Sequence, residues 1–179
     1  MTGTRDDIWV FAYGSLMWHP GFAHVEARPA WLRGYHRAFC IYSYHYRGTA
    51  ERPGLVLGLD RGGSCRGMAF RVAADEAGEV LAYLEDREHV LPVYERRVLP
   101  VSLGTRRVPA TTYLADRKGP QYAGKLAPER IAHLLVTGAG RSGTGIEYLE
   151  NTVRHLDELG IPDRRLHALL EHARRMAAG

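Results

Sequence analysis

Cysteine, lysine and long apolar runs are all scarce in this chain of 179 residues. Its two cysteines, Cys40 and Cys65, lie far apart and belong to no CxxC or Cys/His pattern with metal-ligand spacing, so we expect two reduced thiols and no metal site. No apolar run approaches the roughly 18 residues of a membrane-spanning helix. The first seven residues lack the apolar core of a signal peptide. We therefore expect a cytoplasmic protein that has no membrane partner.

Lysine occurs only at Lys118 and Lys125, so almost all of the positive charge comes from arginine. The formal net charge is +4, and the arginines are spread in pairs along the chain rather than gathered in one tract. Net charge bears on association and solubility, not on fold. Positive charge that is scattered along the chain gives little support to a nucleic-acid partner. An anionic small molecule is equally compatible with this charge. The 45% hydrophobic and 25% charged residues are typical of a globular protein.

The order of the predicted elements indicates an α+β protein. Residues 8–13 are apolar at every position, which predicts a strand buried on both faces. Two hairpins are predicted further on, one turning at residues 61–64 and the other at Gly104 and Thr105. Amphipathic helices are predicted at residues 75–88, 128–136, 147–159 and 163–176. Since strands fill the first two thirds and helices the last third, with no linker between them, we expect one α+β domain over residues 1–179.

The first predicted helix has an acidic residue where its apolar face should continue. The stripe comprises Ala77, Val80, Leu81 and Leu84. The next position in the same i, i+3, i+4, i+7 series is Glu88, whereas Glu85 lies off the stripe. A carboxylate at that position either turns out to water at the helix end or is held in a pocket where it can exchange protons with a substrate. Arg87, beside it, could be a structural ion-pair partner.

A turn that could bind an anion follows the first predicted strand. Tyr13-Gly14-Ser15-Leu16 ends the apolar run, and such a turn can direct backbone N–H groups and a hydroxyl at one anionic group. The alternative is a plain strand-ending turn. Ser15 lacks the G-x-S-x-G context of a serine nucleophile, so we do not expect it to attack a substrate.

Three further patterns carry less weight. Residues 138–143 match G-x-G-x-x-G, but a helix rather than a strand is predicted before them, so we do not expect a nucleotide site. We interpret the segment as a loop that leads into the next helix, which Thr144 or Gly145 could cap. The histidines form no HExxH motif. Tyrosines alternate over residues 42–46, as on a sheet face, although they could also stack on bases.

Four segments together resemble one known family. They are residues 9–18 (Trp-Val-Phe-Ala-Tyr-Gly-Ser-Leu-Met-Trp), 83–88 (Tyr-Leu-Glu-Asp-Arg-Glu), 140–143 (Gly-Arg-Ser-Gly) and 147–149 (Glu-Tyr-Leu). The chain is similar over nearly its whole length to the ChaC-like family of glutathione-specific gamma-glutamylcyclotransferases. The resemblance implies a mixed β-barrel-like sheet surrounded by helices. It also implies a carbon–nitrogen lyase that converts glutathione to 5-oxoproline and Cys-Gly with no cofactor or metal.

The resemblance also assigns the site residues. In this family a glycine-serine loop holds the α-amino and α-carboxylate groups of the gamma-glutamyl moiety, and a glutamate is the proton acceptor. Carried over, the proton acceptor is Glu88, and the substrate-binding residues are Val10, Phe11, Ala12, Tyr13, Gly14, Ser15 and Leu16. Tyr148, in the Glu-Tyr-Leu segment, is expected to reach the substrate as well. Family members act as small proteins, so a monomer is expected.

One segment departs from the family, and it leaves alternatives open. Many members follow the catalytic glutamate with glycine before the next tyrosine, whereas residues 89–93 here read His-Val-Leu-Pro-Val. The resemblance therefore does not imply the rim of the pocket or the leaving group. The nearest alternative is a cyclotransferase for other gamma-glutamyl peptides or amines. A non-catalytic module that binds anionic peptide ends and an RNA-binding domain are two further alternatives.

Overall fold

The computed structural model describes residues 6–88 and 93–179, and it describes Glu88 by its backbone alone. The departing segment at residues 89–93 lies outside the described residues except for Val93. The chain divides into two compact units. The first comprises Met1–Arg37 and Leu59–Asp116, and the second comprises Ala38–Gly58 and Arg117–Gly179. One domain over residues 1–179 stays a prediction.

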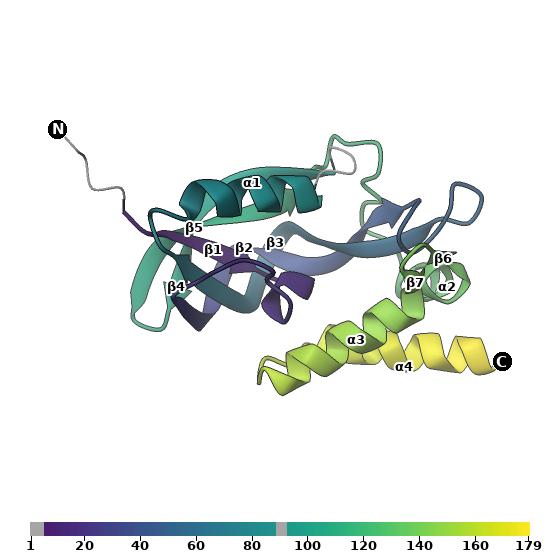
Figure 1. The fold of residues 1–179 in the computed structure, drawn as a ribbon. Coiled ribbons are helices and arrows are strands. Elements are labelled where there is room, and N and C mark those ends of the chain that lie inside the picture. The colour runs from purple at the N-terminus through teal and green to yellow at the C-terminus, as the bar shows by residue number, and fades with distance from the viewer. Residues whose placement is uncertain (1–5, 89–92) are drawn as a thin grey trace. The chain divides into compact units, whose positions relative to one another are not determined.

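Five strands form a closed barrel (Figure 1), and most of their residues belong to the first unit, while residues 38–43 and 54–58 belong to the second. The strands are β1 (Ile8–Ala12), β2 (Glu26–Ser43), β3 (Gly54–Val72), β4 (Tyr94–Leu103) and β5 (Arg106–Ala115), in the barrel order β1-β3-β2-β4-β5. β1 pairs antiparallel with β3 and parallel with β5, and β4 pairs antiparallel with β2 and β5. The sheet is therefore mixed, and the predicted barrel-like α+β fold is confirmed.

Apolar side chains from all five strands fill the barrel. The cluster comprises Trp9, Phe11, Ala30, Leu32, Leu59, Cys65, Ala69, Val101, Leu103, Val108, Ala110 and Leu114. β1 is buried on both faces, as its unbroken apolar run predicts, because Val10 and Ala12 are also fully buried. Burial of one large apolar side chain contributes about 1.5–3 kcal/mol. The strand that leads to the predicted loop is thus held firmly in place.

One of the two predicted hairpins is wrong. Residues 61–64 do not reverse the chain, because β3 continues through them as one strand of 19 residues. Gly62 and Gly63 have positive φ angles of 105° and 67°. Glycines in this conformation bend a strand at a bulge as readily as they turn a hairpin. The second hairpin is confirmed, with β4 and β5 joined across Gly104 and Thr105.

Helix α1 (Ala77–Glu88) packs in the first unit with its predicted apolar stripe inward. Val80 and Leu84 are buried, at 5% and 0% exposure. On the flank of the stripe, Glu85 Oε1 accepts a hydrogen bond from Arg96 Nη1 of β4 at 2.6 Å. Glu88 is the last residue of the helix, but its side chain lies outside the described part of the protein, so its place on the inward stripe stays a prediction.

The second unit is mainly helical (Figure 1). It contains α2 (Pro128–Thr137), the short strands β6 (Ala139–Gly140) and β7 (Gly143–Thr144), α3 (Gly145–Glu158) and α4 (Arg164–Ala178), and the three helices contact one another. Thr144 and Asp163 cap α3 and α4 through their side chains. The helix α2, not a strand, precedes residues 138–143, as predicted. Within the described residues, no helix is long and apolar enough to cross a membrane.

Candidate functional site

The predicted substrate-binding residues divide into a buried strand and a partly exposed turn. Val10, Phe11 and Ala12 belong to β1 and their side chains are buried, so only their backbone groups can serve a ligand. Tyr13 and Gly14 follow the strand and are half-buried. A Cβ at Gly14 would meet no atom within 4 Å, so the backbone faces open space at this turn.

The turn continues into a short 3-10 helix, η1 (Ser15–Met17). Leu16 and Met17 are buried and anchor this helix, whereas Ser15 is half-buried at its start. The backbone N–H of His19 donates to the Ser15 carbonyl at 2.8 Å and closes the segment into a compact loop. We call residues 13–20 the glycine-serine loop.

A buried arginine holds this loop from the barrel side. Arg37 of β2 is only 8% exposed. Its Nε donates to the carbonyl oxygen of Tyr13 at 2.6 Å, and its Nη2 donates to the carbonyl oxygen of Arg66 at 2.7 Å. These bonds join the start of the glycine-serine loop to β3. A guanidinium remains charged in proteins, so the loop lies against a fixed positive charge.

A second arginine holds the same loop from α1. Arg87 Nη2 donates to the hydroxyl oxygen of Ser15 at 3.0 Å, and Nη1 donates to the carbonyl oxygens of His19 at 3.0 Å and Pro20 at 3.5 Å. The ion pair with Glu88 that the sequence suggested stays a prediction, because the Glu88 side chain lies outside the described residues; the contacts seen here are hydrogen bonds to a loop distant in sequence. Since Arg87 precedes Glu88, the bonds bring the glycine-serine loop to the end of α1 where Glu88 lies.

Aromatic contacts support the same junction. The Tyr83 hydroxyl accepts a hydrogen bond from Arg87 Nη1 at 3.1 Å, and the ring of Phe22 lies edge-on to Tyr83 and to Phe70. Gly21, with a φ of 71°, comes so close to the Tyr83 hydroxyl that a Cβ there would overlap it. The end of α1 and the segment after η1 therefore pack as one piece.

Tyr148 belongs to the second unit, near the start of α3. Its half-buried ring lies edge-on to Phe39, with centroids 5.9 Å apart, and the Arg47 guanidinium lies 5.1 Å from its centroid. Arg47 Nη1 also donates to the carbonyl oxygens of Ser142 at 2.8 Å and Thr144 at 3.2 Å. Tyr148 is thus held by its own unit, and its contact with a substrate stays a prediction.

A capping box begins α3 just before Tyr148. The backbone N–H of Thr144 donates to Glu147 Oε2 at 2.9 Å, and the backbone N–H of Glu147 donates to Thr144 Oγ1 at 3.2 Å. The pKa of Glu147 is lowered, first by the bond from the Thr144 backbone, then by the Thr144 side chain, and also by the charge of Arg47. The predicted cap at Thr144 is confirmed.

This lowered pKa predicts a pH-dependent contribution to stability. A carboxyl group with a folded pKa below its unfolded value stabilises fully above the unfolded value, and the contribution is lost as pH falls through the folded pKa. We therefore expect Glu147→Gln to melt at a lower temperature than the wild type at pH 6 and the difference to shrink at pH 3. Differential scanning calorimetry at both values tests this. A difference that stays constant with pH would contradict the assignment.

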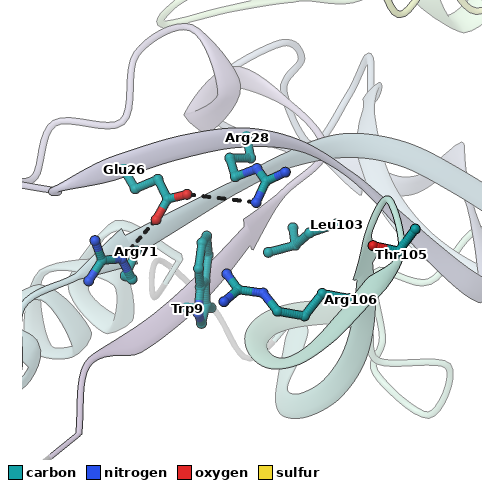
Figure 2. A pocket seen from close by; sticks show the side chains of 7 residues that line it. All are labelled: Trp9, Glu26, Arg28, Arg71, Leu103, Thr105 and Arg106. Carbon is teal, nitrogen blue, oxygen red and sulfur yellow. Dashed lines mark hydrogen bonds and ion pairs between the residues drawn. The ribbon is translucent and has the colours of Figure 1, made fainter.

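A separate pocket of about 510 Å³ lies beside the start of β1 (Figure 2). It is lined by Trp9, Glu26, Arg28, Arg71, Leu103, Thr105 and Arg106. Arg71 Nε donates to Glu26 at 2.9 Å and its Nη1 to Asp7 at 2.7 Å, and these carboxylates raise the pKa of Arg71. Arg71 is thus paired with two carboxylates, and none of these lining residues is a predicted site residue. No group of three His, Cys, Asp or Glu residues suited to a metal occurs in the described residues.

Sequence reasoning missed the two arginines that position the loop. Arg87 was noticed only as a neighbour of Glu88, since its partners lie about 70 positions earlier and no local pattern identifies them. Arg37 carried a usable signal, because it alternates at period two with the buried Phe39 and Ile41 and so falls on the inward face of β2. A buried charge requires partners, and here these are the carbonyl groups of the loop and of β3.

Comparisons with known proteins show the family and the fold. Residues 8–176 match the profile of a family described as ChaC-like protein. Glutathione-specific gamma-glutamylcyclotransferase of Escherichia coli K12 is 34% identical over 172 residues, covering 96% of this chain and 74% of the relative. Glutathione-specific gamma-glutamylcyclotransferase 1 of Mus musculus is 33% identical over 176 residues, covering 94% and 79%. The crystal structure of a glutathione-specific gamma-glutamyl cyclotransferase from yeast shares the fold, with a TM-score of 0.86 and 22% identity over 96% of this chain and all of that one.

Proposed function

Because this chain belongs to the ChaC-like family, we propose that it is a gamma-glutamylcyclotransferase that cleaves glutathione to 5-oxoproline and Cys-Gly. The observation that carries the proposal is that relatives about one third identical, matched over most of their length, are named glutathione-specific gamma-glutamylcyclotransferases. The glycine-serine loop, held next to the end of α1 by Arg87, supports it from the structure.

The proposed reaction is an intramolecular attack. The α-amine nitrogen of the gamma-glutamyl group bonds to its own γ-carbonyl carbon, and the amide bond to cysteine breaks. The protein mainly has to hold the glutamyl end so that amine and carbonyl meet, and orientation of this kind can contribute several kcal/mol to the rate. We assign the binding of the glutamyl end to the backbone of residues 10–14 and to Ser15, and Leu16 anchors the turn. The buried β1 and the two arginines hold these groups still.

Proton transfer is assigned to Glu88. The substrate ammonium must lose a proton before it can attack, and the departing amine must gain one. One carboxylate can do both in turn, first as a base and then as an acid. Glu88 stands at the end of α1, directly after the arginine that contacts the loop. We further propose that Tyr148 contacts the substrate.

A second candidate is a cyclotransferase with a different leaving group. The rim segment at residues 89–93 departs from the family, and one matched relative, 32% identical and from Arabidopsis thaliana, is named gamma-glutamylcyclotransferase 2-3 with no mention of glutathione. The same loop and the same carboxylate would serve such substrates, because every gamma-glutamyl compound carries the same glutamyl end.

The proposal is tested by measuring 5-oxoproline by mass spectrometry. The purified protein is incubated with millimolar glutathione and, in parallel, with each member of a panel of gamma-glutamyl dipeptides. We expect 5-oxoproline and Cys-Gly in equal amounts from glutathione. Turnover of a dipeptide with glutathione inert would favour the second candidate. No turnover of any member of the panel would contradict both.

We also propose that the protein works in the cytoplasm as a monomer, with no cofactor and no nucleic-acid partner. Cys40 and Cys65 are buried and belong to no disulfide in the described part of the chain, which suits a reducing compartment. Light scattering during size-exclusion chromatography measures the mass, which we expect to be close to 20.0 kDa. A mass near twice that value would contradict the monomer.

A further inference from the structure

The pocket beside the start of β1 lies at one end of the barrel (Figure 2). Two of its arginines continue the inward face of their strands, because alternate residues of a strand point to the same side. Arg28 alternates with the buried Ala30 on β2, and Arg106 alternates with the buried Val108 on β5. The inward face therefore changes from apolar to basic at this end. The mouth of a barrel is a common place for a small-molecule site.

Three guanidiniums line the pocket, and the carboxylates do not satisfy them equally. Arg71 is bonded to two carboxylates, as described above. Arg28 Nη1 stays 3.9 Å from Glu26 Oε1, which is beyond hydrogen-bond distance. Arg106 lies 5.8 Å from the centroid of the Trp9 ring and has no carboxylate partner among the described residues. Two guanidiniums therefore keep donors that can bind an anion.

The pocket has room for more than an anionic group. Its volume of about 510 Å³ falls within the range of about 300–1,000 Å³ that is usual for small-molecule sites. Trp9 and Leu103, which belong to the barrel core, give it an apolar wall. The Thr105 hydroxyl, in the turn between β4 and β5, lines it as well. A ligand that fills this space therefore combines an anionic group with an organic body.

We propose that this pocket binds the phosphate monoester of a small organic molecule, at a site separate from the glycine-serine loop. Such a phosphate carries a charge of about −1.5 to −2 at neutral pH and has three oxygens that accept hydrogen bonds. Arg28 and Arg106 can each donate a pair of parallel N–H bonds to it. A carboxylate, with two oxygens and one charge, would leave one guanidinium unused. β1 runs from Trp9 at the pocket to Ala12 before the loop, so the ligand does not occupy the proposed active site.

An NMR titration of the whole chain with phenyl phosphate tests the proposal. The readout is the indole N–H signal of Trp9, which is identified by its absence from the spectrum of Trp9→Phe. The signals of Trp18 and Trp31 are internal references, because neither residue lines this pocket. We expect the Trp9 signal to shift to saturation with a Kd of roughly 0.1–1 mM, which suits a ligand of so few atoms. The two reference signals should move little.

Arg28→Ala and Arg106→Ala should each weaken binding by about 10-fold or more, the range for a lost hydrogen bond to a charged group. Arg106→Lys should lie between wild type and Arg106→Ala, because lysine keeps the charge but not the planar donor pair. Arg107→Ala is the matched control, since it removes the same charge from the next position of β5. Arg107 points to the opposite side of the strand and lines a different pocket together with Trp31. This variant should bind as tightly as the wild type.

Benzoate and inorganic phosphate are titrated in parallel. Benzoate should bind about 10-fold more weakly than phenyl phosphate, and equal affinity would overturn the assignment to a phosphate. Equal affinity for inorganic phosphate would contradict the organic body. The proposal is overturned if the Trp9 signal shows no saturable shift, or if Arg107→Ala weakens binding as much as Arg106→Ala, because binding would then follow net charge alone. None of these results depends on turnover of glutathione, so the proposed function is tested separately.

Discussion

Glu88→Gln is expected to lower kcat on gamma-glutamyl substrates by about 100-fold or more, the usual range for loss of a general acid-base group. Glutamine has nearly the same shape as glutamate but cannot take a proton from the substrate ammonium. Val80 and Leu84, on the same stripe of α1, are buried and unchanged by the substitution, so the fold should persist. Steady-state kinetics with 5-oxoproline detection, together with a thermal melt, separates lost chemistry from lost structure.

Glu85→Gln is the matched control for this experiment. Glu85 lies on the same helix, but it flanks the stripe and pairs with Arg96 at 2.6 Å on a partly exposed surface. Exposed ion pairs contribute about 0–1 kcal/mol to stability, so both turnover and melting temperature should stay near wild type. A Glu88→Gln protein that turns over as fast as Glu85→Gln would remove Glu88 from the mechanism.

Gly67→Ala should be strongly destabilising. Gly67 is buried in β3, and a Cβ there would overlap the carbonyl oxygen of Ala12 and come within 2.8 Å of the Phe11 ring. The Ala12 carbonyl belongs to the backbone of β1 and cannot rotate away. Overpacking of this kind costs about 1–3 kcal/mol, and more where backbone must move. Urea unfolding should show a lower midpoint, and the residual folded enzyme should be less active because the displaced atoms adjoin the glycine-serine loop.

Gly78→Ala is the counterpart to this change. Gly78 lies in α1, and a Cβ there would meet no atom within 4 Å. Alanine is favoured over glycine in a helix by about 1 kcal/mol, so the variant should be at least as stable as the wild type. If the two alanine variants unfolded at the same urea concentration, β1 and β3 would not be as tightly packed at Gly67 as the structure shows.

Local signals in the sequence predicted most of the elements correctly. The hairpin that turns at Gly104 and Thr105 was predicted correctly, because two strands joined by a two-residue turn pair directly with each other. The helix start at Thr144 followed from capping chemistry, which acts within a few residues. Gly62 and Gly63 misled the prediction, since positive φ serves both turns and bulges. Whether residues 61–64 form a hairpin turn or a bulge within one strand depends on which strands pair with them, and the local sequence does not contain that information.

The candidate site was predictable only in part for a similar reason. An apolar run that ends in Gly14 and Ser15, and an acid in register with Leu84, can each be found within one segment. The bond from Arg87 to Ser15 joins residues 72 positions apart, and the bond from Arg37 to Tyr13 joins residues 24 apart. Such contacts depend on how the barrel closes and where α1 lies against it. The sequence therefore predicted the loop and the proton acceptor as separate features, and the structure supplies the arginines that hold the loop in place.

The parallel pairing of β1 with β5 also determines when the glycine-serine loop can form. β1 meets its partner at Ala110 and Thr111, and the Thr112 hydroxyl that donates to the Phe11 carbonyl lies 101 positions along the chain. At about 5–20 residues per second, a ribosome needs roughly 5–20 seconds to deliver that partner after β1 has emerged. Until then the edge of β1 that pairs with β5 has no partner, and before Met68–Val72 of β3 have emerged the other edge has none either. A nascent chain stopped before residue 110 thus contains every residue of the loop but not the strand that closes the barrel beside it.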